Sequence, residues 1–307
     1  MSAAIVIALL PVIFLIGFGH LIRRTGFLSE AFWPQAERLS YFVLLPALFM
    51  HGLATADLDG LPVGKLAGTL VVTLCIVGAL LAVANRFLKI DGPAFTSVFQ
   101  GGIRFNNYVG VTAAVGLFGP GAIALAAVAN ASIVPTVNVL CLLVFARYGS
   151  ARPGFFGVVR TIVTNPLVVS CVIGIALQAS GLGLPAGIAG FFKALGQASL
   201  PLGLLCVGAA LDWGALGRGM KETLTATVTK FAIMPPATAL IALAFGLRGD
   251  AALLAVMFQA LPTASSSYVL ARQLGGDAPL MASIIAFQTV LAAITVPATL
   301  ILYAALI

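Results

Sequence analysis

The residue best suited to bind a small charged molecule lies in the middle of a long apolar stretch. Arg104 stands in the run FQGGIRFNNYVG, from Phe99 to Gly110. A guanidinium presents a planar fork of donors that matches a carboxylate, and a charge among apolar residues is costly unless it is paired. We expect no Asp or Glu at the same depth to pair with it. Arg104 is therefore the main candidate for binding an anion, and two other roles stay open: donation to carbonyls freed at a helix break, and replacement of a coupling cation.

This stretch and a second one both carry residues that interrupt helices. Asn106 and Asn107 follow two glycines in the first stretch, and the second, FQALPTASSSYVLARQLGG, contains Pro262. Proline removes a backbone donor, while glycine and asparagine tolerate non-helical angles. We expect both helices to break near their middles and the breaks to face each other, so that half-helix N-termini can hold an anion and free carbonyls a cation. Kinks that only shape packing are the alternative.

Further polar residues are expected to line the same site. The candidates lie at or near the two breaks and are Asn106, Asn107, Asn130, Asn138, Pro262, Thr263, Ser265, Ser266 and Gln288. An amide side chain in a membrane helix more often forms a hydrogen bond to another helix than a contact with a substrate. Lys230 has no counterpart in the first half, and we expect its amine to snorkel to the membrane surface or to tie down a helix.

The elements that must position these residues are transmembrane helices. Of the 307 residues, 61% are hydrophobic and 8% are charged, whereas about a quarter of a soluble domain is charged. A helix of about 20 apolar residues crosses the hydrocarbon core of a bilayer. Ten such spans are predicted, at residues 3–22, 36–55, 65–87, 94–118, 121–147, 161–179, 195–212, 222–246, 250–272 and 279–305. The predicted fold is an all-α integral membrane protein whose fourth and ninth helices are broken.

Basic residues predict the orientation of these spans. One set of loops carries Lys65, Lys193 and Arg248, and the other carries Arg23, Arg24, Arg38, Arg86, Lys89, Arg147, Arg152, Arg160, Arg218, Lys221 and Arg272. Loops rich in Lys and Arg stay on the cytoplasmic side. The larger set is therefore predicted to be cytoplasmic, and both termini face outward. We expect a multi-pass protein of a bacterial inner membrane with periplasmic termini.

Two halves of the sequence repeat one another. Leu200-Pro201 follows Leu45-Pro46 at an offset of 155 positions, and Phe258-Gln259 follows Phe99-Gln100 at 159. Small insertions in the loops explain why the offset increases along the chain. Each half, residues 1–152 and 153–307, holds five spans, and an odd number of spans inverts the second copy. Inverted repeats recur among secondary transporters.

These features predict a carrier that moves a small organic anion by alternating access, with a channel-like or cation-selective protein as the alternative. An intramembrane enzyme is less favoured, because no GxSxG or HExxH motif is present and no histidine lies in the second half. The cysteines lack metal-ligand spacing, and no cofactor is predicted. Coupling to Na⁺ or H⁺ stays open. The expected partners are the substrate and the lipid bilayer, with no nucleic acid; a homodimer is possible.

The ten-span plan, Asn106-Asn107 and the stretch PTASSSYVLARQLGGD resemble the bacterial auxin efflux carrier family, which includes malonate and malate transporters. The resemblance implies a fold shared with plant PIN-type exporters and, more distantly, with bile-acid:sodium symporters. It implies a scaffold of helices 1, 2, 6 and 7 and a transport unit of helices 3–5 and 8–10, crossing at Asn106, Asn107 and Pro262. The sequence departs from the family pattern in lacking a proline at the first crossing and in carrying Arg104 there.

Overall fold

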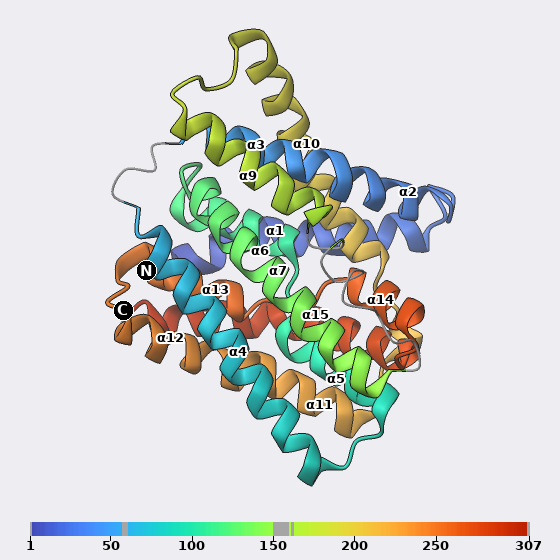
Figure 1. The fold of residues 1–307 in the computed structure, drawn as a ribbon. Helices are drawn as coiled ribbons and strands as arrows, with labels where there is room; N and C mark the ends of the chain where they lie inside the picture. Colours follow the sequence, from blue (N-terminus) through green and yellow to red (C-terminus); the bar gives the residue numbers. More distant parts are fainter. Residues whose placement is uncertain (1, 57–60, 150–159, 161–162, 306–307) are drawn as a thin grey trace.

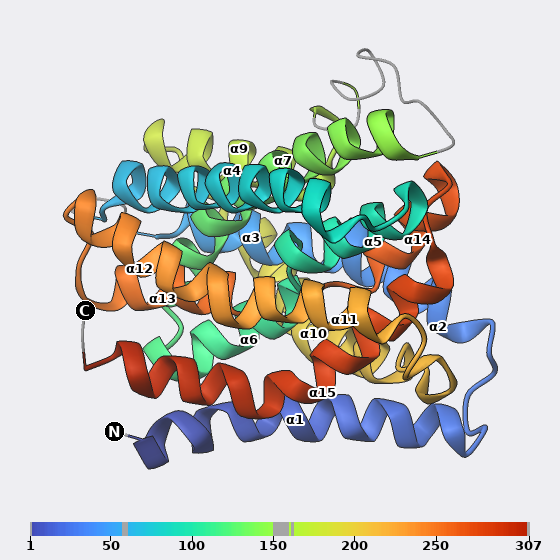
Figure 2. The same cartoon turned by 90° about the horizontal axis from the view of Figure 1, so that it is seen from below.

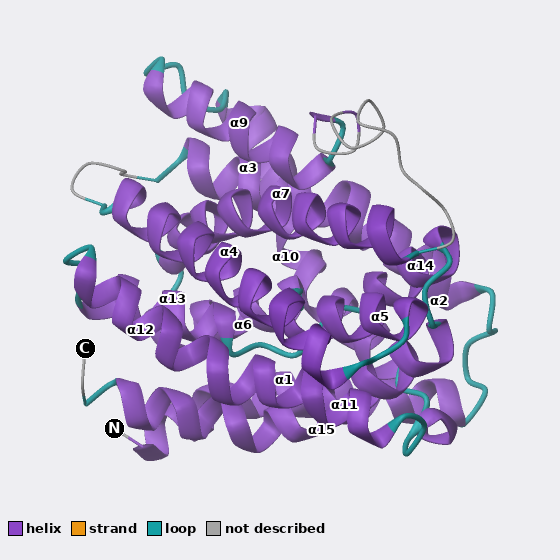
Figure 3. Ribbon diagram, turned by 60° about the horizontal axis from the view of Figure 1, so that its bottom comes forward, coloured by secondary structure: helices purple, strands orange, loops and turns teal. Residues whose placement is uncertain are grey.

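The computed structural model describes residues 2–56, 61–149, 160 and 163–305. Every regular element in these residues is helical (Figures 1 and 3). The predicted boundary between the halves, at residues 152 and 153, lies outside the described residues, as do Arg152 and the first two residues of the predicted span 161–179.

The first half contains long helices and two composite ones. Its elements are α1 (Ser2–Arg24), α2 (Phe32–Leu39), the π-helical turn η1 (Ser40–Leu44), α3 (Leu45–Ala54), α4 (Val63–Leu88), α5 (Gly92–Ile103), α6 (Asn107–Phe118) and α7 (Ala122–Tyr148). The elements α2, η1 and α3 follow one another without a gap. The predicted span 94–118 consists of α5 and α6, which are separate helices.

The residues after 160 also form long and composite helices. Their elements are α9 (Pro166–Ala179), α10 (Ala186–Ala209), the short 3-10 turn η2 (Trp213–Ala215), α11 (Met220–Val228), the π-helical turn η3 (Thr229–Ile233), α12 (Met234–Ala244), α13 (Gly249–Gln259), α14 (Ser266–Leu274) and α15 (Ala278–Tyr303). The elements α11, η3 and α12 form one continuous stretch. The predicted span 250–272 consists of two helices, α13 and α14.

The helices have the length and composition of membrane spans. In the described residues, six are long and apolar enough to cross a bilayer alone: Ile5–Arg24, Val63–Leu88, Ala122–Tyr148, Gly187–Ala209, Met220–Ala244 and Ala278–Tyr303. Pro166–Ala179 and Gly249–Gln259 are shorter apolar helices. The prediction of a helical integral membrane protein agrees with these lengths.

The largest boundary error lies at the start of α10. The span predicted at 195–212 begins at Ala186 and ends at Ala209. Lys193 and nearby glycines lower the hydropathy of this region, so the prediction started after them. Lys193 lies within the helix, and its side chain is exposed.

Three helix contacts organise the part of the bundle around α10. Helix α1 packs along α10, and α3 packs against both α9 and α10. Figure 2 shows α1 and α15 side by side, with the start of α1 and the end of α15 at the same end of the bundle. Glycines allow the closest approaches: a Cβ atom on Gly19 would overlap the backbone of Leu205, and one on Gly208 would overlap the carbonyl of Ile16. Small residues are the usual means by which membrane helices approach so closely.

Gly19→Ala should therefore lower the unfolding temperature. The added methyl group meets the backbone of α10, and overpacking of this kind costs roughly 1–3 kcal/mol. Gly17→Ala is the matched control, because a Cβ atom there meets nothing within 4 Å. Differential scanning fluorimetry in detergent measures both variants, and equal melting of Gly19→Ala and wild type would contradict the close packing of α1 on α10.

Candidate functional site

The first candidate stretch contains a break between α5 and α6. Helix α5 ends just before Arg104, whose backbone is extended, and α6 begins just after Asn106. The side-chain oxygen of Asn106 accepts hydrogen bonds from the backbone N–H groups of Tyr108 (3.1 Å) and Val109 (3.2 Å). Asparagine is a favoured N-cap. The Asn106 cap therefore starts a new helix where the sequence has no proline.

The second candidate stretch is also broken. Helix α13 ends at Gln259, and the link to α14 contains Pro262 and Thr263. The Thr263 and Ser267 hydroxyl oxygens lie 3.2 Å apart, and both side chains are fully buried. Both of the interruptions expected from the sequence are present.

Gln288 of α15 joins the two breaks. Its Oε1 atom accepts a hydrogen bond of 3.1 Å from the backbone N–H of Thr263, and its Nε2 atom donates one of 3.0 Å to the carbonyl of Gly101. Gln288 has no exposed surface. The rings of Phe105 and Phe258 lie nearby, with centroids 5.7 Å apart. The two breaks are thus neighbours. The buried Gln288 amide bonds to a backbone N–H of the second break and to a backbone carbonyl at the end of α5, beside the first.

Arg104 points toward α7. Its Nη1 atom donates to the Oδ1 atom of Asn138 at 3.1 Å, and its guanidinium lies in electrostatic range of the Cys141 thiol. The side chain is only half-buried. In the described residues, Arg104 forms no salt bridge; the ion pair present there joins Arg23 and Glu30. The guanidinium therefore keeps donors for a ligand beside the first break.

Other predicted site residues have mixed positions. Asn130 donates to the carbonyl of Ala126 in its own helix at 2.8 Å, and it makes no hydrogen bond to Gln288. The Oδ1 atoms of Asn130 and Asn107 are buried and have no partner among the described residues. Ser266 is half-buried at the start of α14. The unpaired Asn107 oxygen lies at the first break, at the start of α6.

Pro262 lies in a separate, apolar pocket. This pocket of about 270 Å³ lies between α1 and α15, and it is also lined by Val109, Leu211 and Trp213. Thr289, one residue beyond Gln288, faces the same pocket and has a buried hydroxyl without a partner in the described structure. The second break therefore has an apolar side as well as a polar one.

The expected position of Lys230 is wrong. Its side chain is 0% exposed, and Nζ has no hydrogen-bond partner among the described residues. The amine therefore neither snorkels to a surface nor ties two helices together. The η3 turn, which the sequence did not predict, puts Lys230 on the interior face of its helix.

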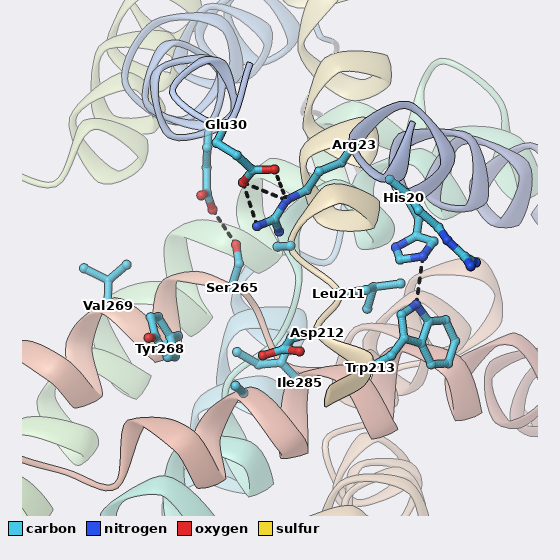
Figure 4. Close-up of a pocket in the computed structure, with 14 residues that line it drawn as sticks. His20, Arg23, Glu30, Leu211, Asp212, Trp213, Ser265, Tyr268, Val269 and Ile285 are labelled. Carbon is cyan, nitrogen blue, oxygen red and sulfur yellow. Dashed lines mark hydrogen bonds and ion pairs between the residues drawn. The ribbon is translucent and has the colours of Figure 1, made fainter. Parts of the chain in front are cut away.

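A larger cavity, of about 980 Å³, reaches the second break (Figure 4). Its outer part is lined by Arg23 and Glu30, whose Nη2 and Oε2 atoms form an ion pair of 2.8 Å. His20 lies on the same wall and accepts a hydrogen bond of 2.9 Å from the indole of Trp213. The inner part contains Ser265. The cavity connects one end of the bundle with the start of α14.

Glu37 is the functional candidate that the sequence reasoning missed. Ser265 donates a hydrogen bond to its carboxylate, and Glu37 is half-buried in the cavity wall. A carboxylate therefore lies beside the second break, although none pairs with Arg104 among the described residues. Glu37 stands near the start of a predicted span, and only the tertiary contact between α2 and α14 shows that its side chain reaches the second break. Among the described residues, no group of three or more His, Cys, Asp or Glu side chains is placed to hold a metal ion.

Comparison with known proteins gives one family. Residues 155–300 match the model of a family described as "Membrane transport protein". No curated protein matches the chain. The matched region includes Lys230, Ser265 and Gln288.

Proposed function

We propose that the protein is a secondary transporter that moves a small organic anion across a bacterial inner membrane by alternating access, because residues 155–300 match the model of a family described as "Membrane transport protein". The observation that carries this proposal is the meeting of two broken helices at Gln288, with Arg104 and the unpaired amide oxygen of Asn107 beside them. Non-helical backbone at membrane depth is tolerated where it is buried in protein or lines a polar cavity. A carboxylate or dicarboxylate, such as malonate, malate or an auxin-like acid, is the proposed cargo, because Arg104 offers a fork of donors and has no carboxylate partner in the described residues.

We also propose that residues 1–152 and 153–307 are inverted five-helix repeats. Two swapped contacts support this. Gly19 packs on Leu205, and Gly174 packs on Met50. Gly174 follows Gly19 by 155 positions, and Leu205 follows Met50 by the same 155. A pseudo-two-fold axis produces such an exchange of partners, and inverted repeats related by an axis in the membrane plane are common in secondary transporters.

The large cavity is proposed as the entrance from the cytoplasm. Arg23 and Arg24 line its outer part, and the loops richest in Lys and Arg face the cytoplasm in membrane proteins. On this basis the described state is open inward as far as Ser265. The hydrogen bond from Ser265 to Glu37 ties α14 to α2, and transport would require it to break and re-form.

A cysteine placed in the cavity tests this orientation. Val269→Cys should react with a membrane-impermeant maleimide from the cytoplasmic side and not from the periplasmic side, because Val269 lines the cavity and is 48% exposed. Leu182→Cys, in the turn between α9 and α10, is 80% exposed and should react only from the periplasmic side. Both variants are made in a Cys75→Ser background, since Cys75 is the exposed native cysteine of the described residues. Labelling of Val269→Cys from the periplasm alone would reverse the proposed topology.

The activity itself is tested by binding and by transport. Purified protein is heated with malonate, L-malate or indole-3-acetate, each with and without sodium, and a ligand that binds the native state raises the unfolding temperature. The stabilising acid is then supplied to proteoliposomes in radiolabelled form. Saturable uptake with counterflow supports a carrier, whereas uptake that rises linearly with concentration indicates a channel. Stabilisation by none of the three acids would reject the proposed cargo class.

A further inference from the structure

The amine of Lys230 is a basic group buried without a counter-charge among the described residues. Lys230 lies near the middle of the helical stretch formed by α11, η3 and α12. Its side chain is fully buried, and Nζ has no hydrogen-bond partner in the described residues. A π-helical turn inside an α-helix is rare and is often found at functional sites. A buried ammonium without a partner costs several kcal/mol, so its presence calls for a function.

The amine lies close to the proposed anion site. The η3 turn packs against α5 at the first break: a Cβ atom on Gly102 would lie 3.1 Å from the Thr229 side chain. On the α7 side, Lys230 lies in electrostatic range of the buried Cys141 thiol. Arg104 lies in range of the same thiol. Two basic side chains are therefore within electrostatic range of the same buried thiol.

In the part of the chain that the structure describes, no acidic residue pairs with Lys230. The elements that pack against η3 are α4, α5, α11 and α12, and α7 faces the amine through Cys141. Glu222 is the acidic residue of these five helices, and it lies eight residues before Lys230, about 12 Å along the helix axis. The remaining ionisable residues of these helices lie near their ends or, for Cys75, at the exposed surface: Lys65, Cys75, Arg86, Arg147, Tyr148 and Lys221.

These positions give Lys230 a different protonation state in the empty and the occupied site. With the site empty, the ammonium is desolvated and has no anion nearby, so release of its proton removes an unpaired buried charge. When an anion binds between the two basic side chains, it supplies the missing counter-charge and favours the ammonium. The neutral amine becomes an ammonium by accepting one proton from water, and no other bond forms or breaks.

We propose that Lys230 binds a proton together with the transported anion, so that the protein carries anion and proton in the same direction. This inference rests on the proposed function and adds to it the identity of the coupling ion and of the group that holds it. Anion binding then takes up one proton per site, and the anion binds more weakly as the pH rises. Over the range in which the empty site is neutral and the occupied site is protonated, the affinity falls about tenfold per pH unit.

Proton uptake on binding tests the inference. Purified protein in a weakly buffered solution with an indicator dye is mixed with malonate, and with L-malate and indole-3-acetate in parallel. The wild type should take up close to one proton per bound anion. Lys230→Met should lose the uptake, because it has no amine. Lys230→Arg should still bind the anion, without proton uptake and with an affinity independent of pH, because a guanidinium stays protonated. An inward proton gradient should accelerate uptake into proteoliposomes by the wild type and not by Lys230→Arg.

Lys221→Met is the matched control. Lys221 lies on the same helical stretch, but its exposed side chain donates to the carbonyl of Leu88 at 2.9 Å, so its removal should leave proton uptake unchanged. Thermal stabilisation by an acid without proton uptake, or uptake retained in Lys230→Met, overturns the inference and leaves the anion transporter standing. Absence of stabilisation by all three acids rejects the proposed function, and the proton role of Lys230 is rejected with it.

Discussion

Arg104→Ala should abolish organic-anion uptake while the protein remains folded. The guanidinium is half-buried beside the first break and has no carboxylate partner in the described residues. A hydrogen bond to a charged group contributes about 1.5–3 kcal/mol, which corresponds to roughly 10- to 150-fold weaker anion binding. In the protein itself the side chain donates to Asn138 and lies close to the Cys141 thiol. Because the side chain is only half-buried, its loss should change the unfolding temperature little. Uptake of radiolabelled malonate by proteoliposomes and melting in detergent measure the two effects separately.

Two further variants make this result specific. Arg104→Lys keeps the positive charge but loses the planar fork, and its uptake should lie between those of Arg104→Ala and the wild type. Arg86→Ala removes an exposed arginine at the end of α4 and should transport at the wild-type rate. Full uptake by Arg104→Ala would show that the guanidinium does not hold the anion. It would favour the other two roles considered for Arg104, donation to carbonyls freed at the helix break and replacement of a coupling cation.

The two helix breaks could be predicted from sequence because their causes are local. Pro262 cannot donate to the helix ladder, and Asn106 caps a new helix with its own side chain. Both effects operate within one turn of the residue concerned. Hydropathy located the long helices for a similar reason, since a run of apolar residues must be long enough to cross the bilayer.

The contacts between segments could not be predicted in the same way. Glu37 and Ser265 are 228 positions apart, and Gln288 and Gly101 are 187 apart. Their meeting depends on how the helices pack, which no single stretch of sequence specifies. The burial of Lys230 could not be predicted from the sequence either. Its distance from the helix end permits snorkelling, but the π-helical turn η3 rotates it into the interior.

Gln288 matters for the site because it is shared by both breaks. A glutamine side chain has one acceptor and one donor end, and here Oε1 pairs with the Thr263 N–H while Nε2 pairs with the Gly101 carbonyl. Without it, a backbone donor and a backbone acceptor are left unpaired inside the membrane. Each unsatisfied buried group costs about 1–3 kcal/mol. The two broken helices are therefore held in register by a single residue, and its loss should affect the fold and the transport together.

Gln288→Leu should accordingly lower the unfolding temperature and also reduce malonate uptake at least about tenfold, since a shift of 1.4 kcal/mol corresponds to that factor. Gln288→Glu keeps the acceptor for Thr263 and loses the donor to Gly101, so it should lie between Gln288→Leu and the wild type in both measurements. Hydrogen exchange gives a local readout, because the Thr263 amide should exchange faster in Gln288→Leu and remain protected in Gln288→Glu. Gln273→Leu, at an exposed position of α14, controls for the loss of an amide elsewhere. Arg104→Ala is expected to lose transport and keep its stability, whereas Gln288→Leu is expected to lose both. A stable, inactive Gln288→Leu would mean that Gln288 acts on the anion directly instead of joining the two breaks.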